Sequence, residues 1–243
     1  MIKVILEEIA GFRPAVKAMR NPMNSWDKSD SYETHIEDVE TLETAPFEFF
    51  LGDNDLKLMQ NLTNAGVEHR TFARMIQVWI TIDAPLYWWK EMDRYTVGKT
   101  QVSCSTMHKI HTKPIELSDF SMDDFYIDDD GIDLKDMFIG VVADCECLRK
   151  RFLTAVENSK KKDHFTEAEQ KHFSRQAKQF WKGLIQLLPS SYNQKRTINM
   201  NYEVCMKIWK ERHNHKLDEW KTLCDFILDL PYMKDIMKVD ADE

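Results

Sequence analysis

The chain contains 243 residues with a formal net charge of −8, and 43% of its residues are hydrophobic. This length suits one large domain or two small ones. The acidity excludes a general binder of nucleic acid or of an anionic membrane, although a small anionic ligand fits if basic residues cluster locally. The chain has five cysteines, and neither a recognisable leader nor a long apolar run is evident. We therefore expect a cytoplasmic protein with reduced thiols.

The first half of the chain predicts alternating strands and helices. Residues 2–6 read as a strand, and a short helix is expected around residues 15–20. Apolar residues recur at helical spacing from Asp53 to about Arg70, which predicts a helix. The β-branched residues at 75–82 then predict a strand. Pro85 is expected in the first turn of the next helix, where its missing N–H costs nothing.

The second half is predicted to be mainly helical. Helices are expected at 138–153 and 166–187, with Thr166 and Glu169 as a capping box. Residues 197–199 are expected to be extended, and one long helix is expected over 201–230. Residues 112–136 form an acidic insertion loop.

A calcium site in the acidic loop was tested against the spacing of a calcium-binding loop. If Gly131 took the sixth position, the first would be Tyr126 and the twelfth Met137. Neither residue supplies the carboxylate that calcium requires, so a solvated acidic loop is the better interpretation. No metal site is predicted.

A basic cluster follows Pro189. Lys195 and Arg196 are expected in a turn, and Arg212 lies eleven residues after Asn201, about three helical turns, so the latter two are expected to share one face. A guanidinium can hold a phosphate through two parallel hydrogen bonds. The alternative is a solvated helix with ordinary ion pairs.

The segment 99–108 is predicted to be a polar loop that follows a helix. Its amide, hydroxyl and thiol groups could bond a pyrimidine or a phosphate, and Gln101, Ser103 and Ser105 are the candidates. Nucleophilic catalysis by Ser105 or a neighbouring thiol with His108 is an alternative, but adjacency in sequence does not establish a triad. A plain connecting loop is the remaining alternative.

The other residue patterns favour structural roles. Cys145 and Cys147 lie two apart, so they point in different directions on a helix and do not form a metal pair. His213 and His215 diverge for the same reason. The tryptophans at 79, 88 and 89 are expected in the core.

The order and spacing of several of these residues resemble the sequence motifs of the flavin-dependent thymidylate synthases. In that family a strand ends in Ala-Pro, a helix bears Arg-His-Arg, and a loop carries Ser-x-Arg-Tyr. The matching positions here are Ala84, Pro85, Arg94 and, within one residue, Ser105. The C-terminal half matches in order and spacing through Leu188, Pro189, Arg196, Asn201, Arg212, His215 and Trp220.

The resemblance implies an α+β fold like that of the thymidylate synthase complementing proteins, a mixed or antiparallel sheet packed with long helices, in one domain over residues 1–243. It implies reductive methylation of dUMP to dTMP with FAD and methylenetetrahydrofolate, with NADPH as a possible further partner, in a homotetramer. By this resemblance Ser105, Arg94 and Arg212 are catalytic. Substrate contacts fall to Arg196, Arg212, Ser103, Ser105 and Gln101, and cofactor contacts to Arg94, Tyr95, Asn201 and His215.

The chain departs from the family where positive charge is concentrated. Tyr95 and Thr96 replace the His and second Arg of the triplet, and Met107 and His108 replace Arg-Tyr. Met75 stands where the family has a His. Each lost charged hydrogen bond costs about 1.5–3 kcal/mol, unless neighbouring lysines or His108 compensate.

Three hypotheses therefore stay open. The first is an enzyme of the thymidylate synthase type. The second is a nucleotide-binding protein of the same fold that lacks flavin and methyl transfer. The third is an interaction protein that keeps only the fold.

Overall fold

The structure, a computed structural model, describes residues 1–34, 48–127, 130–131 and 133–239. Its strands are β1 (Lys3–Ala10), β2 (Tyr32–Thr34), β3 (Glu48–Phe50), β4 (Gln77–Pro85), β5 (Lys99–Ser103) and β6 (Asn193–Asn201). Its α-helices are α1 (Phe12–Arg20), α2 (Asp53–Ala65), α3 (Leu86–Met92), α4 (Thr106–Lys109), α5 (Leu134–Lys160), α6 (Glu167–Leu187), α7 (Tyr202–Arg212), α8 (Asp218–Leu228) and α9 (Met233–Met237). No helix in these ranges is long and apolar enough to cross a membrane.

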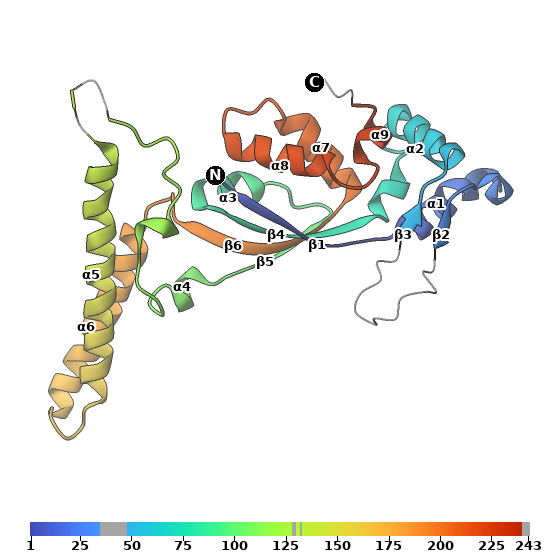
Figure 1. Ribbon diagram of the computed structural model, residues 1–243. Helices are drawn as coiled ribbons and strands as arrows, with labels where there is room; N and C mark the ends of the chain where they lie inside the picture. The colour runs from blue at the N-terminus through green and yellow to red at the C-terminus, as the bar shows by residue number, and fades with distance from the viewer. Residues whose placement is uncertain (35–47, 128–129, 132, 240–243) are drawn as a thin grey trace, which may run out of the picture. The chain divides into compact units, whose positions relative to one another are not determined.

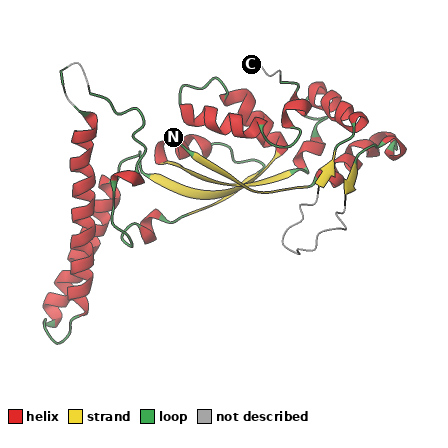
Figure 2. Cartoon of the chain, in the orientation of Figure 1, coloured by secondary structure: helices red, strands yellow, loops and turns green. Residues whose placement is uncertain are grey.

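The main sheet has four strands in the order β1-β4-β6-β5, and β2 and β3 form a separate antiparallel pair (Figures 1 and 2). The central strands β4 and β6 are antiparallel. Thr81 hydrogen-bonds Thr197, and three residues earlier on β4 the Val78 carbonyl accepts from Asn199, which lies two residues later on β6. Alternate residues of β4 are buried, which is the period-2 pattern of a strand with one face on a core. The α+β class is therefore confirmed.

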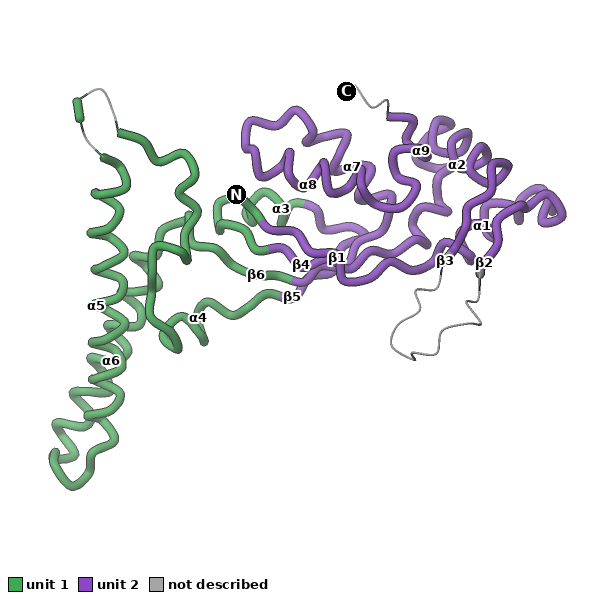
Figure 3. The backbone as a smooth tube through the Cα atoms, viewed as in Figure 1, with its two compact units in different colours: residues 1–2, 83–94, 103–196 green, residues 3–82, 95–102, 197–243 purple. Residues whose placement is uncertain are grey.

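The chain divides into two compact units, each built from separate segments of sequence (Figure 3). Unit 1 contains Met1–Ile2, Asp83–Arg94 and Ser103–Arg196, and unit 2 contains Lys3–Ile82, Tyr95–Val102 and Thr197–Glu243.

Unit 1 is dominated by the helical hairpin of α5 and α6. Thr166 caps α6, and the predicted capping box with Glu169 is confirmed, since each side chain bonds the other's backbone N–H. At the base of the hairpin lies a hydrophobic cluster, which includes Ile110, Phe120, Cys145 and Leu184. The hairpin is longer than expected, because α5 begins at Leu134 rather than Phe138 and continues to Lys160.

Unit 2 has an aromatic and a polar anchor in its N-terminal part. Phe12 contacts the rings of Phe49, Tyr202 and Tyr232 at centroid distances between 5.4 and 5.7 Å. The buried Asp55 accepts a 2.6 Å hydrogen bond from Arg20. Burial alone would raise the pKa of Asp55, but hydrogen bonds from two serines and Arg20 lower it below its usual value.

Several predicted boundaries were wrong. The helix from Asp53 ends at Ala65 instead of Arg70, because Gly66 adopts a φ of +131° that no helix continues. Pro85 is the last residue of β4 and the N-cap of α3, so it precedes the first turn. Arg196 lies in β6 rather than in a turn, because the strand extends from Asn193 to Asn201.

Two larger segments also differ from the prediction. The expected loop 99–108 contains a strand, β5, and a short helix, α4, since pairing with β6 supplies hydrogen bonds that the local sequence does not. The expected helix over 201–230 is interrupted between Arg212 and Asp218. There His213 and His215 bond nearby backbone groups, which competes with the helical pattern. The acidic residues at 128 and 129 lie outside the described residues.

Candidate functional site

Arg196 is held rigidly in unit 1 and is mostly buried. Its Nη1 donates to Asp93 Oδ1 at 2.7 Å, and its Nε donates to Gln194 Oε1 at 2.9 Å. The guanidinium carbon lies 4.3 Å from the centre of the Trp89 ring, a cation–π contact. We refer to Arg196, Asp93, Gln194 and Trp89 as the Arg196 cluster. These contacts fix the orientation of the guanidinium, so its donors have set directions toward an anion such as a phosphate or a carboxylate.

Gln194 connects this cluster to the segment that the sequence singled out. Its Nε2 donates to the Cys104 carbonyl at 2.9 Å and to Thr106 Oγ1 at 3.0 Å. The backbone N–H of Cys104 donates to the Lys195 carbonyl at 2.9 Å. The structure therefore brings the strand of Arg196 together with residues 103–108, which we call the Ser/Cys segment.

The predicted residues of that segment have modest roles in the described structure. Ser105 is the N-cap of α4, and its Oγ accepts the N–H of His108 at 3.2 Å. Ser103 ends β5 and is exposed. Gln101 accepts a hydrogen bond from Lys99 at 3.1 Å. Ser105 is bonded to the backbone of His108, not to its imidazole, so this contact is a helix cap and not a catalytic pair.

Arg212 lies in unit 2 at the end of α7, within an aromatic environment. Its Nε donates to the Tyr95 hydroxyl at 3.0 Å, and its guanidinium carbon lies 4.7 Å from the Trp220 ring centre. The Tyr95 hydroxyl donates in turn to Glu211 at 2.8 Å. Burial and the bond to Glu211 raise the pKa of Tyr95, while Arg212 opposes them, and the net pKa lies above the usual value. The phenol therefore stays protonated at neutral pH and bridges the two charged groups.

A cavity of about 600 Å³ lies beside the N-terminus of α7 in unit 2. Its lining includes Asn201, the N-cap of α7, whose Oδ1 accepts the Val204 N–H at 3.0 Å. Gly98 also lines it, with a φ of +73°, and an added Cβ would approach Asn201 and Val204 to 2.9 Å. Its charged lining consists of Arg70, Arg74, Glu203, Lys207, Lys210 and Glu211. We call this space the basic cavity.

The remaining cofactor candidates, Tyr95, His215 and Arg94, lie in different environments. Tyr95 is buried and lies behind the lining of the basic cavity, where its hydroxyl bonds the lining residue Glu211. His215 follows α7, and its Nδ1 accepts the Leu217 N–H at 3.2 Å. Arg94 is exposed just beyond the end of α3, not on the helix, and it is not among the residues that line the basic cavity.

Sequence reasoning missed the groups that orient the two predicted arginines. Trp89 was expected in the core, and it is fully buried, yet it also stacks under Arg196. Asp93 gave no signal, because Arg196 lies 103 residues away along the chain. The link from Gln194 to Cys104 spans 90 residues and gave none either. Arg70 and Arg74 were likewise not singled out.

The other chemistry-bearing residues agree with structural roles. Within the described ranges, no group of three histidine, cysteine or carboxylate side chains could hold a metal ion. Cys145 is buried and Cys147 is exposed, as their spacing on a helix predicts. Burial raises the pKa of the Cys145 thiol to about 11 and of the Cys205 thiol to about 12. These thiols are therefore poor nucleophiles at neutral pH.

No family description matches the sequence, and no curated protein is a detectable sequence relative. Solved structures do match over nearly the whole chain. Thymidylate synthase X from Helicobacter pylori, crystallised with FAD and dUMP, aligns with a TM-score of 0.61 at 15% identity, over 98% of this chain and 97% of that one. A second structure of that enzyme, also with FAD and dUMP, gives a TM-score of 0.60.

A related nucleotide enzyme has the same fold. The UMP/dUMP methylase PolB from Streptomyces cacaoi, bound with 5-Br dUMP, aligns with a TM-score of 0.54 at 12% identity, over 93% of this chain and 88% of that one. The chain therefore has the α+β fold of the flavin-dependent thymidylate synthases. At these identities the likeness establishes the fold alone.

Proposed function

We propose that the chain is an enzyme that methylates a pyrimidine nucleotide, converting dUMP to dTMP with FAD and methylenetetrahydrofolate, with NADPH as the source of reducing equivalents. The observation that carries the proposal is the Arg196 cluster, a pre-oriented guanidinium joined through Gln194 to the Ser/Cys segment. The fold shared with enzymes crystallised with dUMP or an analogue supports the same conclusion. The proposal takes residues 1–243 as one functional domain, because both units are built from interleaved segments.

Arg196 is proposed to bind the nucleotide phosphate. Its stack on Trp89 and its bond to Gln194 leave the bond to Asp93 as the one that an anion can replace. The Asp93 side chain is 44% exposed, so an incoming phosphate can reach this ion pair and compete with Asp93 for Arg196. Ser105, Ser103 and Gln101 are proposed as neutral hydrogen-bonding groups for the same ligand.

Arg212 is proposed to contact the pyrimidine and to stabilise the charge that develops on it. Tyr95 replaces the family's histidine and fixes the Nε edge of Arg212. The Trp220 ring fixes the plane of the guanidinium. A group held in this way is oriented before substrate binds, which is the condition for electrostatic catalysis.

FAD is proposed to occupy the basic cavity, with Asn201 in its wall and Tyr95, His215 and Arg94 as further cofactor contacts. The cavity's volume lies within the range of about 300–1,000 Å³ typical of ligand sites. Its cationic side chains suit the anionic part of a dinucleotide. Bound in its reduced form, the flavin would supply the hydride that completes the methyl group.

A flavin-free nucleotide-binding protein is the second candidate. It is favoured by the exposed position of Arg94 and by the replacement of the next two motif residues with Tyr95 and Thr96. In that case Arg196 and Arg212 would bind nucleotide without methyl transfer.

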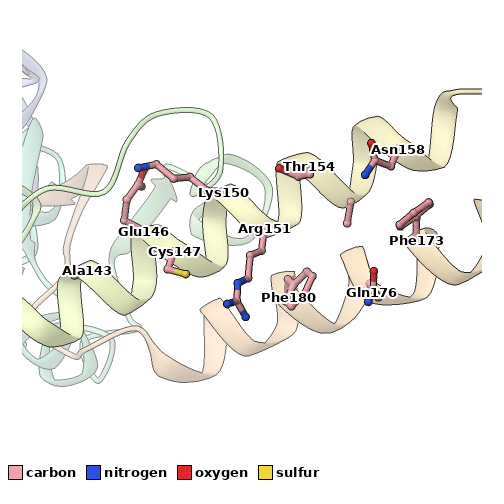
Figure 4. Close-up of a pocket in the computed structure, with 11 residues that line it drawn as sticks. Ala143, Glu146, Cys147, Lys150, Arg151, Thr154, Asn158, Phe173, Gln176 and Phe180 are labelled. Carbon is pink, nitrogen blue, oxygen red and sulfur yellow. The ribbon is translucent and has the colours of Figure 1, made fainter. Parts of the chain in front are cut away.

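A homotetramer is part of the proposal, and the α5–α6 hairpin supports it. Of the 27 residues of α5 and the 21 of α6, six in total are buried. A groove of about 660 Å³ runs between the two helices, where Phe180 of α6 lies beside Arg151 of α5 and Phe173 of α6 lies near Asn158 of α5 (Figure 4). A helix pair gains most of its stability from packing, so we propose that another copy of the chain covers this groove. Light scattering on the purified protein tests the tetramer.

The main test is the absorbance spectrum of protein purified without added cofactor and again after FAD soaking and desalting. Retained flavin, followed by release of tritium from C5-labelled dUMP in the presence of methylenetetrahydrofolate, is the expected result. If the folded protein retained no flavin but bound dUMP, the result would support the second candidate, a flavin-free nucleotide-binding protein.

The nucleotide site is tested by Arg196→Ala, with the exposed Arg175→Ala on α6 as the matched control. Loss of a charged hydrogen bond predicts dUMP binding weakened by about tenfold or more. Unchanged binding in Arg196→Ala, or an equal loss in the control, would remove the phosphate assignment.

A further inference from the structure

Arg70 is a buried cation whose Nε has no hydrogen-bond partner among the described residues. The residue is 8% exposed and lines the basic cavity. Among the described residues, its side chain forms an ion pair with Glu203. The distance from Nε to Oε1 is 3.6 Å, which is too long for a hydrogen bond. An arginine cannot lose its charge in a protein, so it requires an anion.

Glu203 is committed mainly to another arginine. Its carboxylate accepts from Arg74 Nε and, at 3.2 Å, from Arg74 Nη2, which is a two-point contact. This bond raises the pKa of Arg74 above its usual value. One carboxylate thus faces two guanidinium groups and pairs closely with one of them. The single carboxylate of Glu203 therefore does not pair closely with both Arg70 and Arg74.

The rest of the cavity strengthens the positive field. Lys207 and Lys210 also line it, so four cationic side chains face two carboxylates, those of Glu203 and Glu211. The N-terminus of α7, an eleven-residue helix, lies in the same wall and adds a partial positive charge. The chain as a whole has a net charge of −8. The local excess of positive charge is therefore a property of this cavity and not of the general surface.

We propose that the basic cavity contains a phosphate or diphosphate subsite, in which Arg70 and Arg74 bind the anion and Glu203 competes with it. This deepens the proposed function, because it assigns the diphosphate part of the cofactor to residues outside the sequence motif. The positive charges absent at Tyr95 and Thr96 are then supplied by Arg70 and Arg74. The ligand's oxygens would fill the donor of Arg70 and share Arg74 with Glu203 or displace it.

The test is calorimetric titration of the full chain with inorganic pyrophosphate at low ionic strength, without flavin or nucleotide. Arg74→Ala is a mild change, because that side chain is 50% exposed, and it should weaken binding by about tenfold or more. Glu203→Gln removes the competing charge and should strengthen binding by a similar factor. Arg70→Lys keeps the charge but loses the planar donor set, and it should weaken binding.

A matched control is available in the same unit. Arg13 pairs with Glu33 at 3.4 Å, and the Arg13 side chain is 76% exposed. Arg13→Ala and Glu33→Gln change the net charge as the test variants do, but outside the cavity. Both should bind pyrophosphate as the unmodified chain does.

Opposite effects of Arg74→Ala and Glu203→Gln, with silent controls, would establish the subsite even if the protein retained no flavin. Binding that is unchanged in Arg74→Ala and Glu203→Gln would overturn it. If Arg13→Ala and Glu33→Gln changed pyrophosphate affinity as much as the cavity variants, the effect would come from net charge alone. That result would also overturn the proposed subsite. Retention of FAD with identical affinity in Arg74→Ala would reject the subsite while leaving the proposed enzyme intact.

Discussion

Glu146 of α5 provides a sharp prediction about acid stability. Its two carboxylate oxygens accept from Arg149 Nε at 2.7 Å and Nη2 at 2.8 Å, and one of them also accepts the Ile115 N–H at 2.9 Å. Arg149 in turn donates to the His111 carbonyl at 3.1 Å. This network ties residues 111–115 to the hairpin within unit 1.

The network has a measurable electrostatic consequence. The hydrogen bond from Arg149 is the main cause that lowers the pKa of Glu146 from 4.5 to about 2, with burial opposing and the Ile115 N–H assisting. Each pKa unit corresponds to about 1.4 kcal/mol, so a fall from 4.5 to about 2 corresponds to about 3.5 kcal/mol. Screening by solvent at this partly exposed pair reduces the expected stabilisation to about 2–3 kcal/mol. A depressed pKa gives stability that is complete above pH 4.5 and is lost as the pH falls toward 2.

The substitution Glu146→Gln keeps the size and one acceptor oxygen but removes the charge. Urea unfolding followed by circular dichroism should show the variant less stable by about 2–3 kcal/mol at pH 7. The difference should shrink steadily between pH 5 and pH 3, because the unmodified chain loses the same interaction. Glu157→Gln, which removes an exposed partner of Lys161 on the same helix, is the control and should show no comparable effect.

Two results would refute this reasoning. Equal stability of Glu146→Gln and the unmodified chain at pH 7 would show that the ion pair contributes nothing. A deficit that stays constant from pH 7 to pH 3 would show that the charge of Glu146 is not its source.

Three further predictions concern unit 2 and the thiols. Gly98→Ala should lower the free energy of unfolding by about 1–2 kcal/mol, because its positive φ and the nearby Asn201 oppose a Cβ; urea unfolding tests this, and an unchanged midpoint would contradict it. Tyr95→Phe removes the bridge between Glu211 and Arg212 and should cost about 1 kcal/mol in the same assay. Ellman's reagent should react quickly with the exposed thiol of Cys104, and fast reaction of Cys145, Cys205 and Cys224 would contradict their burial.

The sequence alone determined the elements that depend on local chemistry. The alternation in β4 and the capping box of α6 were both readable, because each depends on residues within a few positions of one another. The spacing of Arg196, Asn201 and Arg212 also identified the correct fold, which the structural matches confirm.

The tertiary structure decided what lies around those residues. Strand β5 and the extension of β6 through Arg196 depend on pairing between distant segments, so local preference for a loop or turn was overridden. Trp89 and Asp93 orient Arg196 only because the fold brings them together across about a hundred residues of sequence. The pairing of Arg70 and Arg74 with Glu203 has the same origin. Ion pairs and stacking depend on distance in space, and sequence spacing reports that distance only within one helix or strand.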